Sequence, residues 1–575
     1  MPVLARAAAA LAVLVLCGSC TGIGARDGSS PVPSSRQWDA FVEQFITETF
    51  AAQPHQGVNA GRHEFDGRLP DLSAEGLQRE VGRLHAARER IRAFDEATLA
   101  PQQRYERDYV LDVLERELFW AETMQWPTVS PGFYGWALDP NVYVAREYAP
   151  LPDRMRAYVA YAKAIPRAAA QARANLKTPM PRTYVQLGRI IFGGLASFYA
   201  NDVPAIFAPV ADARLQEEFR AANALAIAAM KELDAWLAAQ EATATEGFAI
   251  GAARFAEMMW ATEKVDVPIA RLKEIGERDL ERNLAALRAA CARYLPGKSL
   301  ADCTQKVKAE KPPEGPVAAA QRQLESLRAF IVARKVVSIP GPEQASVAEA
   351  PSYRRWNFAY IEIPGPYEKN LPSTYYIAPP DQKWSPAEQL AYLPGKADLL
   401  FVSVHEVWPG HFLQFLHNNR ARSTVGRVFV SYAFSEGWAH YTEEMMWEVG
   451  LNDGDPATHI GQLLNALLRN VRYVSAIGLH TGGMTVAQSE AMFRDKAFQD
   501  PGNSRQQAAR GTFDPGYGNY TLGKLMIRRL RDDWTASRGG RAAWQAFHDE
   551  FLAHGSPPIP VIRKVMLGPT AGPAL

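Results

Sequence analysis

The segment FVSVHEVWPGHFLQFLHNN, residues 401–419, combines an apolar run with two histidines, a glutamate and a proline–glycine pair. Its apolar residues recur at helical spacing, which predicts a helix. His405 and Glu406 begin a pattern close to the metal-binding motif H-E-x-x-H, but the second histidine, His411, comes two residues late. The segment therefore raises the question of whether both histidines can reach one ion.

The spacing alone argues against a regular helix between the two histidines. In H-E-x-x-H the ligands lie about 40° apart around the helix, whereas a six-residue spacing puts them about 120° apart and about 9 Å along the axis. Pro409 lacks an N–H and crowds the preceding turn, and Gly410 tolerates dihedrals closed to other residues. We expect a bulge or unwound turn that returns His405 and His411 to one face. The alternative is one helix that ends at Trp408 and a second that starts at His411.

A catalytic zinc site needs three protein ligands and an open position for water. The segment SYAFSEGWAHY, residues 431–441, predicts a second helix packed antiparallel to the first, and it offers Glu436 as the third ligand. His440, one turn further along, and His417, near the end of the first helix, are competing ligands. The favoured set is His405, His411 and Glu436.

Further acidic residues surround this set in the sequence. Glu406 is the candidate general base, because a water molecule that attacks a carbonyl must lose a proton. Glu443 and Glu444 are candidates to accept hydrogen bonds from the ligand histidines and so to orient them.

The pair HEVWPGHFLQ and SEGWAHYTEE resembles the bacterial family called domain of unknown function 885, whose hallmark is H-E-x-x-P-G-H followed by E-G-W-A. That family is placed with the gluzincins, zinc peptidases whose third ligand is a glutamate, and dipeptidyl peptidase III carries a related insertion. VDVPIARLKEIGERDLERN and YTLGKLMIRRLRDDW also resemble family segments, so the resemblance covers most of the mature chain. It implies one Zn²⁺ bound by His405, His411 and Glu436, with Glu406 as the base.

The developing oxyanion requires a hydrogen-bond donor in addition to the metal. DPGYGNYTLGK, residues 514–524, presents two tyrosines before a helix, and Tyr520 matches the family pattern Tyr-x-x-Gly, which makes it the favoured catalytic donor. His480 is the rival. One departure from the family is Ala476, where similar proteins tend to carry an aspartate.

Several residues are candidates for substrate binding. The arginines and the lysine among them could pair with a substrate carboxylate, although surface or structural ion pairs are the commoner role of such side chains. The set comprises Arg472, His480, Tyr517, Lys524 and Arg528.

The rest of the chain predicts a mainly α protein. Residues 37–340 read as a helical region, and residues 341–575 as a small sheet plus the helices of the metal site, the two forming one continuous catalytic fold. Strands are expected in NFAYIEIPG and STYYIAPP. The resemblance implies a large helical gluzincin-like architecture, similar to neurolysin and angiotensin-converting enzyme, with the sheet beside the metal helix and a cleft suited to short peptides.

The N-terminus predicts export. Residues 1–20 have a signal-peptide pattern, and Cys20 follows small residues as in a bacterial lipoprotein, where it would be lipidated. Cys17 stands where such sites usually have an aliphatic residue, so simple secretion is the alternative. Residues 21–36 read as a polar tether. The expected location is the periplasm or, through a lipid anchor, the cell envelope.

The remaining cysteines, Cys291 and Cys303, are predicted to form a disulfide, because the chain is exported and the pair is even. Two buried free thiols are the alternative. Neither cysteine is close in sequence to the histidines, which argues against a zinc–thiolate site.

The composition and net charge indicate which classes of partner to expect. The 575 residues are 47% hydrophobic and 22% charged, with a formal net charge of +1, so neither nucleic acid nor an anionic membrane surface is an expected partner. We expect an exported zinc-dependent hydrolase, a metallopeptidase that cleaves short peptides. A non-peptidase zinc amidohydrolase and a non-catalytic envelope binding protein that retains the fold are the alternatives. Glu406 argues against the last, because metal binding alone does not require it.

Overall fold

The computed structural model describes residues 35–351, 354–355 and 357–575. The predicted signal peptide, Cys20 and nearly all of the predicted tether lie outside the described residues. The described chain is mainly helical with a three-stranded sheet, as predicted.

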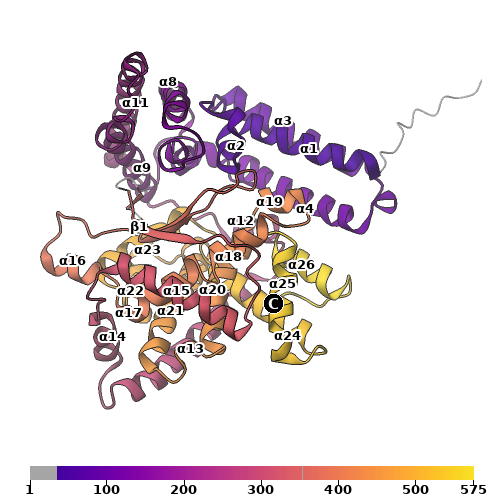
Figure 1. The fold of residues 1–575 in the computed structure, drawn as a ribbon, viewed down its shortest axis with the longest axis vertical. Helices are drawn as coiled ribbons and strands as arrows, with labels where there is room; N and C mark the ends of the chain where they lie inside the picture. The colour runs from indigo at the N-terminus through magenta and orange to yellow at the C-terminus, as the bar shows by residue number, and fades with distance from the viewer. Residues whose placement is uncertain (1–34, 352–353, 356) are drawn as a thin grey trace, which may run out of the picture.

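The N-terminal half of the described chain consists of helices joined by short connections, and they gather at the top of Figure 1 in indigo and purple. Their bounds are α1 Ser35–Ala52, α2 Pro54–Ala60, α3 Ala74–Arg92, α4 Pro101–Leu118, α5 Trp126–Val129, α6 Gly132–Gly135, α7 Asn141–Ala145, α8 Leu151–Asn175, α9 Arg182–Asn201, α10 Val203–Phe207 and α11 Ala213–Gln240.

The C-terminal half contains the remaining helices, which fill the lower part of the same view in magenta to yellow. Their bounds are α12 Ala252–Glu263, α13 Ile269–Tyr294, α14 Leu300–Ala309, α15 Pro316–Arg334, α16 Pro386–Tyr392, α17 Lys396–Glu406, α18 His411–Asn418, α19 Thr424–Val428, α20 Tyr432–Glu448, α21 Pro456–Thr481, α22 Val486–Lys496, α23 Pro501–Phe513, α24 Asn519–Thr535, α25 Trp544–Ala553 and α26 Ile559–Leu567.

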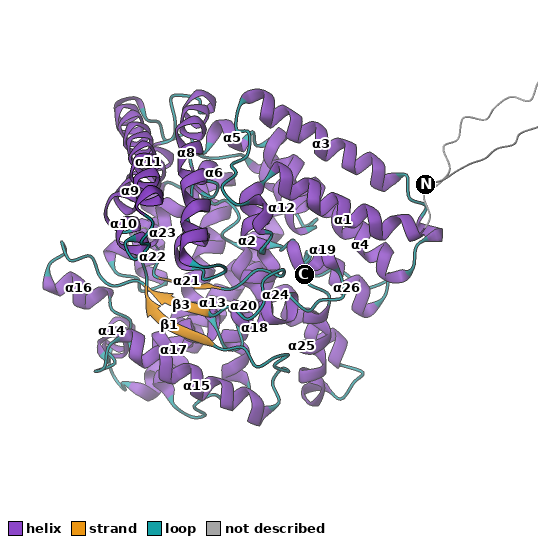
Figure 2. Cartoon of the chain, turned by 45° about the horizontal axis from the view of Figure 1, so that its top comes forward, coloured by secondary structure: helices purple, strands orange, loops and turns teal. Residues whose placement is uncertain are grey.

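The sheet lies between the two groups of helices (Figure 2). Its strands are β1 Ala345–Glu349, β2 Ala359–Glu362 and β3 Ser373–Ile377, in the order β1-β3-β2. β1 pairs with β3 in parallel and β2 pairs with β3 in antiparallel orientation. β2 packs against α17, so the sheet lies beside the helix that carries His405, as predicted. The sequence predicts β2 and β3 but misses β1, whose residues Ala-Ser-Val-Ala-Glu have little strand propensity.

Two hydrophobic cores stabilise the fold. One is built mainly from α1 to α11, with Trp38, Tyr158 and Phe207 among its buried residues. The other joins α12 to α15 with the sheet and the helices that follow it. α19 belongs to the C-terminal half of the sequence, but its Val425 and the adjacent Phe429 pack in the first core. Because α1 to α15 all precede residue 340, the predicted helical region contributes to both cores.

One helical stretch, Arg182–Phe207, is long and apolar enough to cross a membrane by length and composition alone, among the residues described. Buried residues make up 39% of its most apolar window. Within it, α9 packs against α11, and Phe192, Leu195 and Tyr199 lie in the first core.

The loop between β2 and β3 fastens the two halves together. The backbone N–H of Tyr367 donates to the carbonyl of Ala60, at the end of α2 (3.0 Å). The carboxylate of Glu368 lies 2.9 Å from a guanidinium nitrogen of Arg146 and 3.3 Å from Nε2 of His63. We call this group of contacts the clamp.

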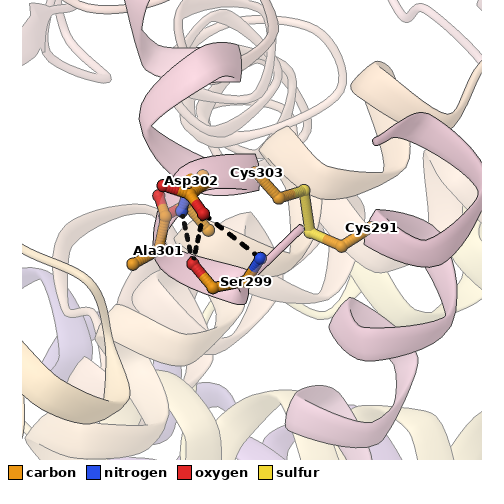
Figure 3. Close-up of a disulfide and its surroundings, with 6 residues drawn as sticks. Cys291, Ser299, Ala301, Asp302 and Cys303 are labelled. Atoms are coloured by element: carbon orange, nitrogen blue, oxygen red, sulfur yellow. Dashed lines mark hydrogen bonds between the residues drawn. A yellow bond between two sulfur atoms is a disulfide. The ribbon is translucent and has the colours of Figure 1, made fainter. Parts of the chain in front are cut away.

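The predicted disulfide between Cys291 and Cys303 is confirmed. It joins the last turns of α13 to α14 across a short connection (Figure 3). Ser299 caps α14 through its hydroxyl, which accepts from the N–H of Asp302. Both cysteines are buried in the C-terminal core.

Candidate metal centre

The motif segment folds as two helices instead of the single helix predicted. α17 ends at Glu406 and α18 starts at His411, with a tight turn between them, which is closer to the alternative reading. The carbonyl of Pro409 accepts a hydrogen bond from Nε1 of Trp438 in α20 (2.9 Å). A Cβ on Gly410 would lie 1.8 Å from the carbonyl oxygen of His405, so only glycine fits at this point of the turn.

The turn brings the side chains of His405, His411 and Glu436 together. Their ligand atoms all lie within 4.8 Å of one another, and no other such group of three is found in the part of the chain that the structure describes. Nε2 of each histidine is 3.3 Å from Oε2 of Glu436. That oxygen is buried and has no hydrogen-bond partner. An ion between the three atoms would satisfy it.

Hydrogen bonds on the far side of each imidazole orient its ligand atom. Nδ1 of His405 is 2.7 Å from Oε1 of Glu443, and Nδ1 of His411 is 3.4 Å from the hydroxyl of Ser435. An ionised carboxylate can only accept, so Nδ1 of His405 donates to Glu443, and Nε2 is the nitrogen that faces the site and would bind an ion. Glu443 thus takes the supporting role that the sequence predicts for it.

The donor set fits zinc. Two imidazole nitrogens and one carboxylate oxygen are the ligands of a catalytic zinc site that keeps a position open for water. Burial alone would lower the pKa of His405, but the neighbouring carboxylates of Glu436 and Glu443 outweigh it and raise that pKa to about 9. A metal ion would replace this proton, so metal binding would weaken as the pH falls.

Glu406 and Tyr520 complete the centre. Burial raises the pKa of the Glu406 carboxyl, and the neighbouring His405 and His411 oppose that rise. Glu406 makes no hydrogen bond to a described residue and is 8% exposed. The ring of Tyr520 stacks on the imidazole of His405, with centroids 6.1 Å apart and an interplanar angle of 17°.

The family model described as bacterial protein of unknown function, DUF885, matches residues 54–566 of the chain. The chain belongs to the DUF885 family. The motif resemblance is thereby confirmed at the level of the family.

Solved structures support the same fold. A candidate lipoprotein of unknown function from Shewanella oneidensis is 22% identical, with a TM-score of 0.76 over 92% of this chain and 99% of that chain. A candidate lipoprotein from Colwellia psychrerythraea is 16% identical, with a TM-score of 0.76 over 93% of this chain and 99% of that chain. No curated protein matches this DUF885 chain.

The competing ligands lie outside the centre of this DUF885 protein. Nδ1 of His440 is 3.2 Å from Glu443, behind His405. Nε2 of His417 is 2.8 Å from the carbonyl of Ser338. Neither imidazole joins the group of three.

Two of the predicted substrate-binding cations are held in a separate ion network. Lys524 is fully buried and lies 2.7 Å from Asp279 and 3.2 Å from Glu444. Arg528 and Arg282 each lie 2.7 Å from the same Glu444. These cations are neutralised within the protein, and Glu444 accepts from them instead of from a ligand histidine.

Two further predicted residues are packed in the interior. Tyr517 is fully buried, with its hydroxyl against Gly511. His480 is 1% exposed, and its Nε2 is 2.7 Å from the carbonyl of the same Gly511. Ala476 lines a small apolar cavity beside Gly518, where an aspartate would have to be buried.

Arg472 is the predicted substrate-binding residue that the structure brings to the centre. Its guanidinium carbon is 4.7 Å from the centroid of the Tyr520 ring. Its Nε–H donates to Oε1 of Gln507 (2.8 Å).

Sequence reasoning missed residues that position the helices of the centre. Glu263, at the end of α12, is 1% exposed and accepts from the hydroxyl of Ser431, the backbone N–H of Ala433 and the side-chain amide of Asn519. It therefore joins the first turn of α20, which carries Glu436, to the first turn of α24. An acidic residue at a helix C-terminus gives no sign in the sequence of this long-range role.

Proposed function

We propose that this protein is an exported zinc-dependent hydrolase, a metallopeptidase of gluzincin type that cleaves short peptides. The observation that carries the proposal is the convergence of His405, His411 and Glu436, with Glu406 next to the first ligand. Membership of the family alone would not support it, because the family is one of unknown function.

Each residue of the centre has a distinct role in this proposal. His405, His411 and Glu436 would hold the zinc ion, which when bound supplies Lewis acidity to the scissile carbonyl. Glu406 takes a proton from the attacking water and passes it to the leaving amine, a task for which a pKa raised by burial is suited. Tyr520 donates a hydrogen bond from its hydroxyl to the carbonyl oxygen as negative charge develops, and it keeps its proton.

Burial of the centre favours small substrates. The side chains of His411 and Glu436 are 12% and 21% exposed, and His405 and Tyr520 are more buried still. A flexible peptide can reach such residues, whereas a folded protein surface cannot.

Export is part of the proposal. It is supported by the signal-peptide pattern of the first 20 residues and by the description of two structures of the same fold as candidate lipoproteins. Anchoring through Cys20 would hold the enzyme at the cell envelope.

The test begins with metal content. Purified wild-type protein is expected to contain about one zinc per chain, and the His411→Ala variant far less. Zinc-loaded wild type is expected to hydrolyse members of a short-peptide library, whereas Glu406→Gln should retain zinc and lose turnover. Equal zinc content in wild type and His411→Ala would refute the metal site. Hydrolysis of non-peptide amides alone would favour the amidohydrolase alternative.

A further inference from the structure

Arg472 is a buried cation without an ionic partner. It lies on α21 and is 7% exposed, so it has lost most of its hydration. Its Nε–H donates to the neutral side chain of Gln507. No carboxylate among the described residues lies within ion-pair distance of its guanidinium group, and the two terminal nitrogens have no hydrogen bond to a described residue.

The other buried arginines of the described chain are compensated. Arg469, Arg531 and Arg563 each lie within 3.3 Å of a carboxylate oxygen. Arg154 donates to the backbone carbonyls of Tyr143, Val144 and Ala149. Arg472 therefore departs from the pattern that this fold follows elsewhere.

Such a residue is costly to the folded state. A buried charge without a partner loses hydration that nothing in the protein replaces, and it is retained where a ligand supplies the opposite charge. Arginine is especially suited to this purpose, because its planar fork of donors matches a carboxylate with two parallel hydrogen bonds.

Arg472 lies at the candidate metal centre. The Tyr520 ring lies close to both groups: its centroid is 4.7 Å from the guanidinium carbon of Arg472 and 6.1 Å from the imidazole centroid of His405. One helical turn earlier on α21, Arg469 contacts Glu443, which in turn holds His405 (3.3 and 2.7 Å). An anion bound by Arg472 would thus lie beside the residues that act on the scissile bond.

We propose that Arg472 binds a carboxylate group of the substrate close to the scissile amide. The inference rests on the proposed function and specifies its substrates: peptides with an anionic group near the cleaved bond. Two sources share this chemistry, the free C-terminal carboxylate and an acidic side chain. A purely structural role, in which the cation only stacks on Tyr520, is the competing explanation.

The first experiment measures binding, using the zinc-loaded Glu406→Gln variant so that peptides are not consumed. Calorimetry would compare Ala-Ala-Ala as the free acid, Ala-Ala-Ala amide and Ala-Ala-Asp amide, each with and without Arg472→Ala. Loss of a charge-assisted pair should weaken the carboxylate-bearing peptide by about 10- to 100-fold and leave the neutral amide nearly unchanged. Whichever of the two acidic peptides responds identifies the source of the carboxylate. Equal weakening of all three peptides, or of none, would overturn the proposal.

The second experiment does not depend on hydrolysis. Succinate should raise the Tm of metal-free wild-type protein and of Arg494→Ala, an exposed arginine on α22, but not of Arg472→Ala. Without ligand, Arg472→Met should have a Tm no lower than wild type, because an unpaired buried charge is removed; a marked fall would support the structural role.

The two proposals can fail separately. A succinate shift lost in Arg472→Ala, in a zinc-loaded protein that hydrolyses no peptide, would support the carboxylate site and refute the peptidase. Peptide hydrolysis with no succinate shift, and equal affinity for acid and amide, would refute the carboxylate site and leave the peptidase standing.

Discussion

At the scale of single residues, two adjacent glutamates of α20 have different tasks. Glu443 faces His405, His440 and Arg469, whereas Glu444 faces Lys524, Arg282 and Arg528. Burial would raise the pKa of Glu443, but the Arg469 guanidinium and the hydrogen bonds from His405 and His440 hold it well below its usual range. The ionised form is the one that fixes the tautomer of His405.

The first prediction concerns Glu443→Gln. The substitution removes the charge that holds His405, so zinc affinity should fall by about 10- to 100-fold, the usual effect of changing such a supporting residue. Competition with a chromophoric chelator would measure the change. Glu444→Gln is the matched control: it lies one residue away, in the separate ion network, and should retain wild-type zinc affinity although it destabilises the fold. Equal zinc affinities for the two variants would contradict this assignment.

Some roles of single residues could be predicted from the sequence and others could not. The motif predicted the three residues that the structure brings together, His405, His411 and Glu436, and Glu443 was a predicted hydrogen-bond acceptor behind them. Glu444 was assigned the same role wrongly, because consecutive residues on a helix point about 100° apart and a sequence does not show which of them faces the ion. Lys524 has the structural ion-pair role that was the alternative to substrate binding, and the sequence could not name its partners, because Asp279 and Glu444 come from distant segments.

At the scale of elements, the turn between α17 and α18 decides whether the imidazoles meet. The second prediction is that Gly410→Ala disrupts it. A methyl group 1.8 Å from the carbonyl oxygen of His405 must displace backbone, which should separate His411 from His405 and abolish stoichiometric zinc binding. Metal analysis and Tm would show both effects. Gly82→Ala is the control, because Gly82 lies in an open position on α3 and its substitution should leave zinc binding and Tm as in wild type. Gly454→Ala is unsuitable as a control, because the φ of Gly454 is positive.

The third prediction concerns the connection of α12 with α20 and α24. Glu263→Ala leaves the hydroxyl of Ser431, the N–H of Ala433 and the amide of Asn519 without their acceptor. Leaving buried donors unpaired costs about 1 to 3 kcal/mol each, so a clear fall in the free energy of unfolding is expected. Hydrolysis should fall as well, because α20 carries Glu436 and α24 carries Tyr520. Denaturant titration that gives wild-type stability would contradict this role.

Helices and strands could be predicted only where the local sequence has a clear periodicity or composition. Helical periodicity predicted the helical region as a whole and the helices of the metal site but not the bounds of most helices, and two of the three strands had clear strand composition. The interruption at Val407–Gly410 was expected from the proline and glycine, but its form was not, because contacts from α20 such as that of Trp438 help to fix the turn.

At the scale of the whole molecule, the clamp between the two halves makes the free energy of unfolding depend on pH. Burial lowers the pKa of His63, but hydrogen bonds to Asp66 and Glu368 outweigh this and raise it to about 9 from its ordinary 6.5. Because the folded pKa is the higher one, the stabilisation is fully present below pH 6.5 and is lost as the pH rises through about 9.

The fourth prediction follows from the raised pKa of His63 in the folded protein. The difference in free energy of unfolding between wild type and His63→Gln should be largest below pH 6.5 and should shrink progressively towards pH 9 and above. Urea titrations at a series of pH values would measure it, and the comparison with the variant removes the contribution of other titrating groups. A difference that is constant across this range would contradict a charged His63 in the clamp.

The division of the helices into two hydrophobic cores could not be predicted from the sequence. Periodicity shows which face of a helix is apolar but not which neighbour covers it. α19 shows the consequence, since it packs against α1 and α4 near the start of the described chain, and its Val425 belongs to the first core. The mainly α class could be predicted from helical periodicity and from the resemblance to the family. The grouping of the helices into two cores depends on packing, which the sequence pattern does not show.

The burial of the bond between Cys291 and Cys303 sets an order of events during maturation. Thiol–disulfide exchange requires a thiolate to approach a sulfur in line, and Cys303 is fully enclosed while Cys291 is 4% exposed. We therefore expect oxidation to precede closure of the C-terminal core. Chains that fold in a reducing cytosol would trap two free thiols beyond the reach of later oxidants, so recombinant material is best produced by secretion or in an oxidising host.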